Sequence, residues 1–329
     1  MVTILDVARK AGVSIASVSY ALNGKPLVSE DTRAHIRKIA DDLGYLPNAM
    51  AAGLVKKVTN LIGLIVPEIT EVYTGRFIKH LEEEARNAGF YPILASTGGE
   101  PEMEEALIRS LMGRNIDACV ILPGNRFLVP AYRRVLSLAE KRGIPFVFAN
   151  ISIPGIRASS VALDLEGGQY RLTRFLVGKG AADILFVGGR RGDFYADLRL
   201  SGFRAALADG SGLHLPGGIS FESGYLLARD FLAAGNKLPE AICAMNDSVA
   251  LGVLKALKER GVAVPGDILL AGFDNIALPT IDAPRLTTME IPVARMCAAC
   301  VDIIHSLSEE PNSKHEIRLD TNFVQGDTA

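Results

Sequence analysis

Side chains suited to binding a small molecule follow several apolar runs of the chain, at points where strands would end. They are Tyr73 and Thr74, then Asn150, then Asp193, Phe194 and Arg199, and finally Asn246 and Asp274. The carboxyl ends of parallel strands meet at one edge of a sheet, where α/β proteins bind their ligands. Guanidinium, amide, hydroxyl and carboxylate groups supply the donors and acceptors that a polar ligand needs. The pattern predicts a binding site for a small polar molecule.

Motifs typical of enzymes and metal sites are incomplete in this sequence. The glycine-rich run Gly188–Gly192 lacks the spacing of a dinucleotide-binding or phosphate-binding loop. Cys297 and Cys300 have the spacing of a metal-binding pair, but no second pair or nearby histidine completes a site. We therefore expect no catalytic residue, no metal and no cofactor, and we expect the four cysteines to be buried structural residues.

A second group of candidate residues lies near the N-terminus, in short segments typical of a helix-turn-helix. Gly12 and Gly24 separate three short helical patterns, and the second helix of such a motif enters the major groove of DNA. Its first turns would present apolar side chains to thymine methyl groups and hydroxyls to base edges. The helix ends would meet phosphates, although each residue taken singly is more often a cap or a surface residue. The predicted DNA contacts are Thr3, Ser14, Ile15, Ala16, Ser17, Ser19, Tyr20 and Asn23.

Charge is distributed unevenly between this head and the rest of the chain. Residues 1–59 hold eight Lys and Arg against five Asp and Glu, a net charge of +3, which leaves −5 for the rest of a chain whose total is −2. A mildly basic head on an acidic body is typical of a protein with one small part that meets phosphate. So small a charge binds DNA weakly in a single copy, and we therefore expect a homodimer on a palindromic site in double-stranded DNA.

From residue 61 onward, strand-like runs alternate with amphipathic helical patterns. We expect strands at residues 61–67, 91–96, 118–122, 145–149, 183–187, 241–244 and 268–273, and helices at 73–88, 102–114, 130–142, 167–179, 198–209, 223–234, 247–260 and 293–308. This alternation predicts parallel sheets with helices on both faces, and a total of about ten strands favours two lobes over one sheet. No apolar run reaches the ~18 residues of a membrane span, and the first residues lack an export signal, so the expected location is the cytoplasm, away from membranes.

The head closely resembles that of the LacI/GalR (lactose-repressor) family. The resemblance is carried by residues 3–14, Ser17-Val18-Ser19, Leu22-Asn23-Gly24, Val28-Ser29, Leu43-Gly44-Tyr45 and Pro47-Asn48-Ala49, and it continues through residues 60–67 into later segments. It implies a small all-α helix-turn-helix head and an α/β periplasmic-binding-protein-like sensor of two doubly wound parallel-sheet lobes. It also implies a ligand-responsive transcriptional regulator, expected to be a repressor that binds a palindromic operator as a dimer.

The resemblance also suggests domain boundaries. The head would span residues 1–46, a hinge helix and linker 47–59, and the effector-binding and dimerisation domain 60–329. Lobe N would comprise about residues 60–160 and 292–322, and lobe C about residues 161–291 and 323–329. In the hinge, Leu54 matches a leucine that this family inserts into the minor groove, with Ala51 beside it, where such a wedge bends DNA.

Within the sensor, the residues that match Arg199, Asn246 and Asp274 line the effector site of the family. Ile219 stands where many relatives have an aromatic ring, and Phe221 is a candidate to replace that ring. Other residues also depart from the family pattern: Tyr20 stands in place of the usual Arg, Asn150 in place of the usual Asp, and Ala52-Gly53 in place of a more polar pair.

Several alternatives remain open at this level. The effector is expected to be a sugar or sugar derivative, while a nucleoside or purine co-repressor also suits the polar set, and either sign of regulation uses the same parts. A two-lobed solute-binding protein shares the fold but would leave residues 1–59 unexplained. Arg199 also suits a buried strut, and Asp164 and Asp247 suit helix N-caps. The sequence ends without a leucine heptad, which favours a dimer over a tetramer.

Overall fold

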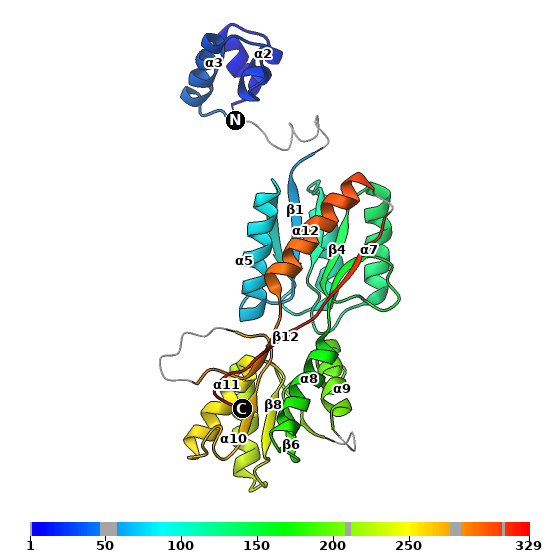
Figure 1. Cartoon of the computed structure of the whole chain (residues 1–329). Coiled ribbons are helices and arrows are strands. Elements are labelled where there is room, and N and C mark those ends of the chain that lie inside the picture. Colours follow the sequence, from blue (N-terminus) through cyan, green and yellow to red (C-terminus); the bar gives the residue numbers. More distant parts are fainter. Residues whose placement is uncertain (1, 47–57, 208–211, 277–283, 311–312) are drawn as a thin grey trace. The chain divides into compact units, whose positions relative to one another are not determined.

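The computed structural model describes residues 2–46, 58–207, 212–276, 284–310 and 313–329 (Figure 1). The chain divides into two compact units, Met1–Thr59 and Asn60–Ala329. The predicted hinge helix, with Ala51 and Leu54, lies outside the described residues. No helix among the described ranges is long and apolar enough to cross a membrane.

The first unit is the predicted three-helix head, with helices α1 (Ile4–Ala11), α2 (Ile15–Leu22) and α3 (Glu30–Asp42). Gly12 ends α1 in the left-handed conformation (φ +67°), which glycine adopts without strain. Ser14 begins α2 as its N-cap, because its hydroxyl accepts a hydrogen bond from the Ser17 backbone N–H at 3.1 Å. Val7, Val18 and Ile36, one from each helix, are fully buried in a common core. The predicted helix-turn-helix is confirmed.

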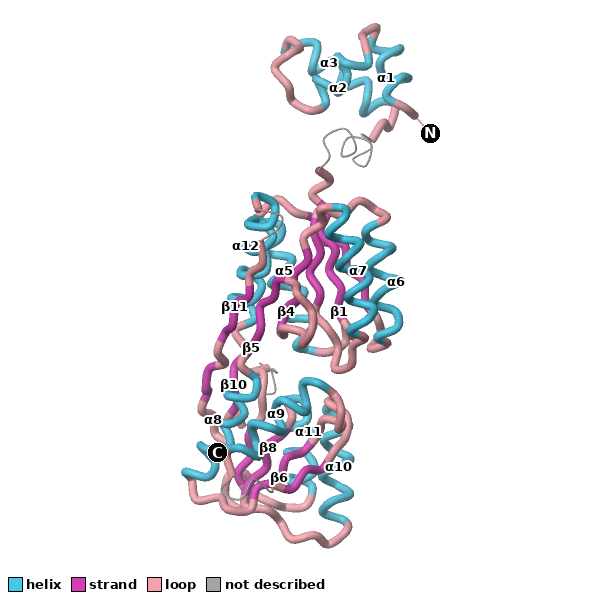
Figure 2. The backbone as a smooth tube through the Cα atoms, turned by 90° about the vertical axis from the view of Figure 1, so that its right-hand side faces the viewer, coloured by secondary structure: helices cyan, strands magenta, loops and turns pink. Residues whose placement is uncertain are grey.

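Lobe N of the second unit contains a six-stranded parallel sheet in the order β11-β5-β4-β3-β1-β2. The strands are β1 (Leu61–Val66), β2 (Tyr91–Ser96), β3 (Ala118–Ile121), β4 (Phe146–Asn150), β5 (Ser159–Leu163) and β11 (Glu316–Leu319). The helices are α5 (Val72–Asn87), α6 (Pro101–Met112), α7 (Val129–Arg142) and α12 (Val293–Glu309). α5 and α12 cover one face of the sheet, and Figure 2 shows α6 and α7 on the other side. Burial on both faces explains the continuous apolar runs of β1 and β3.

Lobe C contains a four-stranded parallel sheet in the order β7-β6-β8-β9, with a short antiparallel pair of β10 and β12 beside it. The strands are β6 (Ile184–Val187), β7 (Leu213–Leu215), β8 (Ala241–Ala244), β9 (Leu269–Ala271), β10 (Thr288–Glu290) and β12 (Asn322–Val324). The helices are α8 (Leu165–Gly178), α9 (Phe194–Ala205), α10 (Phe221–Ala233) and α11 (Asp247–Glu259). α8 packs with α9 and α10 with α11, one pair on each side of the sheet (Figure 1).

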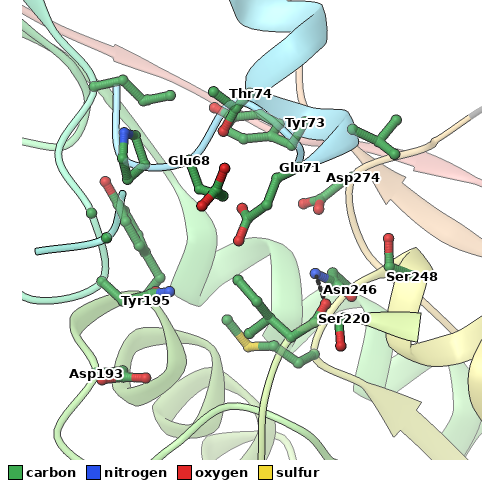
Figure 3. A pocket seen from close by; sticks show the side chains of 18 of the residues that line it. Glu68, Glu71, Tyr73, Thr74, Asp193, Tyr195, Ser220, Asn246, Ser248 and Asp274 are labelled. Carbon is green, nitrogen blue, oxygen red and sulfur yellow. Dashed lines mark hydrogen bonds between the residues drawn. The ribbon is translucent and has the colours of Figure 1, made fainter. Parts of the chain in front are cut away.

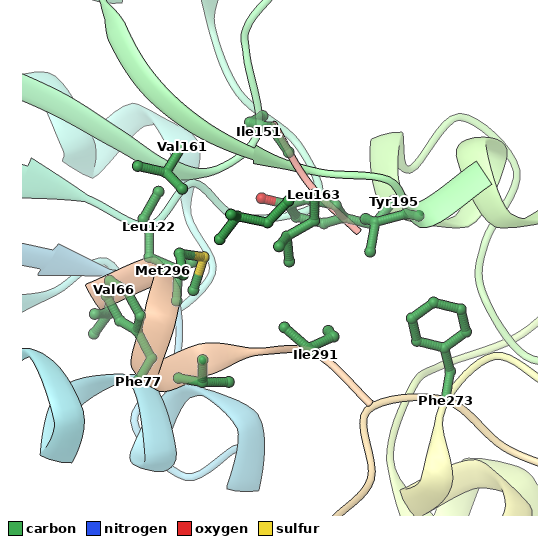
Figure 4. Close-up of a cluster of buried hydrophobic side chains, with 14 of the residues drawn as sticks. Val66, Phe77, Leu122, Ile151, Val161, Leu163, Tyr195, Phe273, Ile291 and Met296 are labelled. Atoms are coloured by element: carbon green, nitrogen blue, oxygen red, sulfur yellow. The ribbon is translucent and has the colours of Figure 1, made fainter. Parts of the chain in front are cut away.

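Three segments connect the lobes: after β5, between β10 and α12, and between β11 and β12. The boundary expected at residues 160 and 161 falls inside β5, which belongs to the sheet of lobe N because it pairs with β4 and β11. Asp164 follows β5 and is the predicted N-cap of α8, accepting a hydrogen bond from the Gly167 N–H at 3.1 Å. Buried apolar side chains continue from one lobe into the other as one cluster, and Figure 4 shows the part around Ile291.

The structure differs from the expected elements mainly where segments are short. β7, β10 and β12 have three residues each, and β5 and β11 pair with each other across more than 150 positions of sequence. Such strands are specified by their partners more than by a local pattern. The predicted helix at 198–209 begins earlier, at Phe194, and this shift changes which side chain faces the ligand site. All four cysteines are free and buried, as predicted.

Candidate functional site

A cavity of about 440 Å³ lies between lobe N and lobe C, at the carboxyl ends of the strands. We call it the interlobe cavity. Loops that follow β1, β3 and β4 form its wall in lobe N, and loops that follow β6, β7, β8 and β9 form its wall in lobe C. Of the ten side chains predicted to contact an effector, nine line it. They are Tyr73, Thr74, Asp193, Asn246 and Asp274, which Figure 3 labels, together with Asn150, Arg199, Ile219 and Phe221. The arrangement of the lobes thus brings together residues separated by up to two hundred positions.

Phe194 is the predicted residue that does not line the interlobe cavity. It is the first residue of α9, and its ring packs against Phe127 of lobe N with the ring centroids 5.3 Å apart. The next residue, Tyr195, lines the cavity instead and donates a hydrogen bond from its hydroxyl to the Pro123 carbonyl at 3.0 Å. Tyr195 was missed because α9 was expected to begin at residue 198, which would leave both aromatic residues in a loop.

Arg199 and Asp274 form an ion pair in the wall of lobe C. The Nη2 of Arg199 lies 2.9 Å from Oδ1 of Asp274, and both side chains are buried. The Nη1 of Arg199 donates to the Met245 carbonyl, and the guanidinium stacks on the Phe273 ring at 4.0 Å from its centroid. Burial raises the pKa of Asp274, while the neighbouring guanidinium opposes that rise. Arg199 is therefore a buried strut and also part of the cavity wall.

Asn246 caps helix α11 in place of Asp247 and also lines the interlobe cavity, as predicted. Asn246 is the N-cap: its Oδ1 accepts a hydrogen bond from the Val249 N–H at 2.8 Å, and its Nδ2 donates to the Ile219 carbonyl at 3.0 Å. The prediction that Asp247 caps the helix is wrong, because its carboxylate is fully buried and accepts hydrogen bonds from Thr288 Oγ1 and the Ile276 N–H. Burial raises the pKa of Asp247 to about 7.

The wall in lobe N combines a hydrogen-bonded pair with two acidic side chains. Tyr73 donates from its hydroxyl to Oδ1 of Asn150 at 3.2 Å, and Asn150 has a positive φ of +78°, which asparagine tolerates better than most residues. Glu68 and Glu71 also line the cavity, and Figure 3 shows their carboxylates between the two walls. Neither glutamate was among the predicted effector contacts, although both lie in the segment between the end of β1 and the start of α5, just before Tyr73 and Thr74. Other lining residues missed from the sequence are Arg126, Arg190, Ser220 and Ser248.

Hydrogen bonds donated by Phe194, Tyr195 and Arg76 hold the lobes together around the interlobe cavity. The Phe194 N–H donates to the Asn125 carbonyl at 2.8 Å, next to the Tyr195–Pro123 bond. Arg76 of α5 donates to the carbonyls of Asp274 and Asn275, at 3.3 and 2.8 Å. A site enclosed by two bridged lobes and lined by amide, hydroxyl and charged groups is suited to surrounding a small polar ligand.

In the head, α2 presents the residues predicted to read DNA. Ile15 is 45% exposed and Ala16 is also exposed, whereas Ser17, Ser19 and Tyr20 are half-buried. The Ser17 hydroxyl shares a hydrogen bond with Ser14 Oγ at 2.9 Å, and Asn23 Nδ2 donates to the Ser19 carbonyl at 2.8 Å. The predicted phosphate contact Thr3 bonds to Asp6 through its N–H and its hydroxyl, at 2.9 and 2.7 Å. Several candidate contacts therefore also hold helix ends in place.

Comparisons with known proteins agree with both units. Residues 3–48 match the family model described as "Bacterial regulatory proteins, lacI family", and residues 173–329 match the model described as "Periplasmic binding protein-like domain". The chain is 31% identical over 324 residues to the HTH-type transcriptional repressor PurR of Vibrio parahaemolyticus, covering 97% of this chain and 95% of that protein. It is 30% identical over 297 residues to catabolite control protein A of Staphylococcus epidermidis, covering 89% and 88%. The Lac repressor bound to ONPG in the repressed state superposes with a TM-score of 0.86 at 25% identity, over 100% of this chain and 99% of that one.

Proposed function

Because the chain belongs to the LacI family of bacterial regulatory proteins, we propose that it is a homodimeric repressor whose operator binding is controlled by a sugar-like effector. The observation that carries the proposal is the convergence of nine predicted effector residues on one interlobe cavity, in a chain that also has a helix-turn-helix head. A DNA-binding regulator acts where the chromosome is, and we expect this one in the cytoplasm.

The effector site favours a ligand with several hydroxyl groups. Both amide atoms of Asn246 are held by backbone groups, and the Tyr73 hydroxyl holds Oδ1 of Asn150 and orients that side chain. Planar polar groups fixed in this way bind the donor–acceptor pattern of a polyol with little loss of side-chain entropy. Phe221, 44% exposed at the cavity, offers an apolar face to the carbon skeleton of a sugar ring.

A purine or nucleoside is the second candidate effector. Phe221 and Ile219 line the same part of the cavity and suit stacking against a planar base. A purine would act as a co-repressor if it favours the DNA-bound form, and the cavity accommodates either sign of regulation.

We propose that two heads bind one palindromic operator. Ile15 and Ala16 of α2 are exposed for contact with bases, and a net charge of +3 on residues 1–59 leaves a single head with few phosphate contacts. Dimerisation needs an apolar surface elsewhere, and Tyr91 and Leu94 of the edge strand β2 are 65% and 45% exposed. Multi-angle light scattering of the full chain tests the dimer.

Coupling between the two units is proposed to run through lobe closure. A ligand that bridges the walls of the interlobe cavity changes the angle between the lobes, and the change is transmitted through residues 47–59 to the heads. Leu54, outside the described residues, is proposed as the minor-groove wedge that is inserted or released, with Ala51 beside it.

The decisive experiment measures operator binding and its response to ligands. The full chain is used to select binding sites from random duplex DNA, and we expect a two-fold symmetric consensus. Fluorescence anisotropy with that DNA is then repeated with sugars, sugar phosphates, nucleosides and purine bases. Ile15→Asp in α2 should abolish specific binding, while Leu213→Asp, at an even more exposed apolar position on β7, should not. Tight ligand binding without any DNA selection would contradict the proposal.

A further inference from the structure

The interlobe cavity has two carboxylates on its wall in lobe N that the protein leaves largely without partners. Glu71 stands at the N-cap position of α5 but makes no capping hydrogen bond, and among the described residues nothing forms a hydrogen bond or ion pair with its carboxylate. Glu68 accepts one bond, from the Thr70 N–H at 3.2 Å. Figure 3 shows both carboxylates turned into the cavity.

A third carboxylate faces the same space from lobe C. Asp274 is 5% exposed, and its Oδ1 is held by Arg199 at 2.9 Å. Its Oδ2 has no hydrogen-bond partner in the part of the chain that the structure describes, and the side chain lines the cavity beside Glu71 (Figure 3). Burial raises the pKa of Glu71 to about 6, and the charges of Asp274 and Glu68 contribute to that rise.

The cationic side chains nearby do not compensate the two glutamates. Arg199 is engaged with Asp274 and the Met245 carbonyl, and Arg76 donates to two backbone carbonyls. Arg126 and Arg190 also line the cavity, but within the described ranges neither forms an ion pair with Glu68 or Glu71. The surface around Glu71 is therefore anionic and partly shielded from water, where a charged ligand group interacts more strongly than in bulk solvent.

We propose that the effector carries an ammonium group that binds beside Glu71 and Glu68, and that it is an amino sugar or a comparable aminated polyol. The inference rests on the proposed function in taking the interlobe cavity as the effector site. An ammonium offers three N–H donors, and its hydrogen bonds to carboxylates are stronger than those of a neutral hydroxyl. A phosphate or carboxylate at this position would be repelled by the carboxylates of Glu71 and Glu68, which form no ion pair among the described residues. Glu71 is thus a specificity-determining residue.

Matched pairs of ligands test the inference on the full chain. Isothermal titration at about pH 7 compares glucosamine with glucose, galactosamine with galactose and mannosamine with mannose, with glucose 6-phosphate as the anionic probe. We expect one amine to bind about tenfold or more tightly than its hydroxyl counterpart, the difference typical of a charge-assisted bond. Glu71→Gln should remove that preference, and Glu82→Gln, which loses an exposed ion pair with Arg86 on the same helix, should retain it.

The pH dependence of amine binding gives an independent readout. The titratable and charged groups around Glu71 are Glu68, Tyr73, Asp274, Arg126, Arg190 and Arg199. With a pKa of about 6, Glu71 is mostly ionised at pH 7 and mostly protonated at pH 5. Affinity for the amine should therefore fall by about tenfold over this range in the native protein, and by much less in Glu71→Gln.

The outcomes separate this inference from the proposed function. The inference is overturned if a neutral hexose, a nucleoside or glucose 6-phosphate binds as tightly as every amino sugar. It is also overturned if none of the three amino sugars binds. If a ligand without an ammonium group binds and also changes operator binding, the proposed function stands and only the inference about the ammonium group fails. If the chain prefers an amine but selects no DNA sequence, the result supports an ammonium-binding site and contradicts the proposed repressor function.

Discussion

Arg199 and Asp274 form an ion pair that belongs both to the core of lobe C and to the wall of the interlobe cavity. Their side chains are 7% and 6% exposed, and the Nη2–Oδ1 distance is 2.9 Å. Arg199 reaches the loop after β8 through the Met245 carbonyl, while Asp274 follows β9 with a positive φ of +107°. Arg199 therefore links the loop after β8 to the loop after β9 and fixes Oδ1 of Asp274 in place.

Asp274→Ala should impair both stability and effector binding. Loss of the carboxylate leaves the Arg199 guanidinium buried without its charged partner, which costs about 3–5 kcal/mol of unfolding free energy. Effector affinity should fall, whereas operator binding, carried by the head, should persist below the melting temperature. Urea denaturation, calorimetric titration of the effector and operator anisotropy measure the three quantities.

Asp274→Asn is the matched control for that change. The amide retains one acceptor for Arg199 and should lose less stability than alanine. If Asp274→Ala leaves effector affinity unchanged, or lowers operator and effector affinity equally, Asp274 has no specific place in the effector site.

Glu104→Gln should stabilise the protein at alkaline pH and have little effect at acidic pH. Glu104 of α6 is 2% exposed, its Oε2 has no described hydrogen-bond partner, and burial raises its pKa from 4.5 to about 7. The folded state therefore binds the proton more tightly than the unfolded state, and this stabilisation is lost as pH rises from below 4.5 through about 7. Gln cannot ionise, so we expect a gain of about 2 kcal/mol near pH 8.

Thermal unfolding of the native protein and of Glu104→Gln at about pH 5 and pH 8 tests whether the variant is more stable only at the higher pH. Asp247 and Glu71, whose raised pKa values act in the same direction, are present in both proteins and cancel in the difference. Glu102→Gln, in the first turn of the same helix, is the control. Destabilisation by Glu104→Gln that is equal at both pH values would mean that the carboxylate is held by a bond that glutamine cannot make.

The sequence predicted those parts of the site that local chemistry decides. Gly12 and Ser14 specify a turn and an N-cap through their own backbone and hydroxyl, and both appear as expected. Asn246 and Asp274 were predicted because each follows an apolar run that forms a strand, β8 and β9. Which of Asn246 and Asp247 caps α11 was not predictable, because both side chains are good caps and only the burial of Asp247 against Thr288 decides between them.

Residues whose direction depends on distant packing were missed. Tyr195 faces the interlobe cavity because α9 begins at Phe194, and that start is fixed by the contact of Phe194 with Phe127 of the other lobe. Glu71 faces the cavity because it does not cap α5, although an acidic residue before a helix is usually read as a cap. The position of Tyr195 follows from a tertiary contact that no local pattern contains.

Tyr20→Ala should weaken binding to the selected operator with little change in the salt dependence of binding. Tyr20 is half-buried on α2, with Lys25 Nζ 5.7 Å from its ring centroid, and it occupies the position where the family usually has Arg. A lost base contact costs about 1–3 kcal/mol, whereas the slope of affinity against salt reports phosphate contacts. Tyr20→Phe separates the hydroxyl from the ring. A steeper loss for random DNA than for the operator would exclude base reading by Tyr20.

Leu54→Ala should weaken operator binding and leave effector affinity unchanged. Leu54 lies outside the described residues, and the expectation comes from its match to the family's minor-groove leucine. Removal of an apolar wedge loses the contacts that a bent operator permits, which we expect to cost at least about 1 kcal/mol. Anisotropy with operator DNA and calorimetry with the effector give the two affinities, and an equal loss in both would contradict a separate role for the hinge.

Tyr195→Phe should weaken effector binding by loosening the contact between the lobes. The Tyr195 hydroxyl donates to the Pro123 carbonyl at 3.0 Å, and both groups stand at the edge of the interlobe cavity, so phenylalanine leaves that carbonyl without its donor. A hydrogen bond of this kind contributes about 0.5–1.5 kcal/mol, which corresponds to a loss of affinity of about two- to twelvefold if it is made only in the closed form. Small-angle scattering should show a larger radius of gyration for the variant without ligand. Tyr170→Phe, on an exposed position of α8, should change neither quantity. If Tyr195→Phe also changes neither, the lobes are held by Arg76 and its two carbonyl partners, and Arg76→Ala should then produce the same opening.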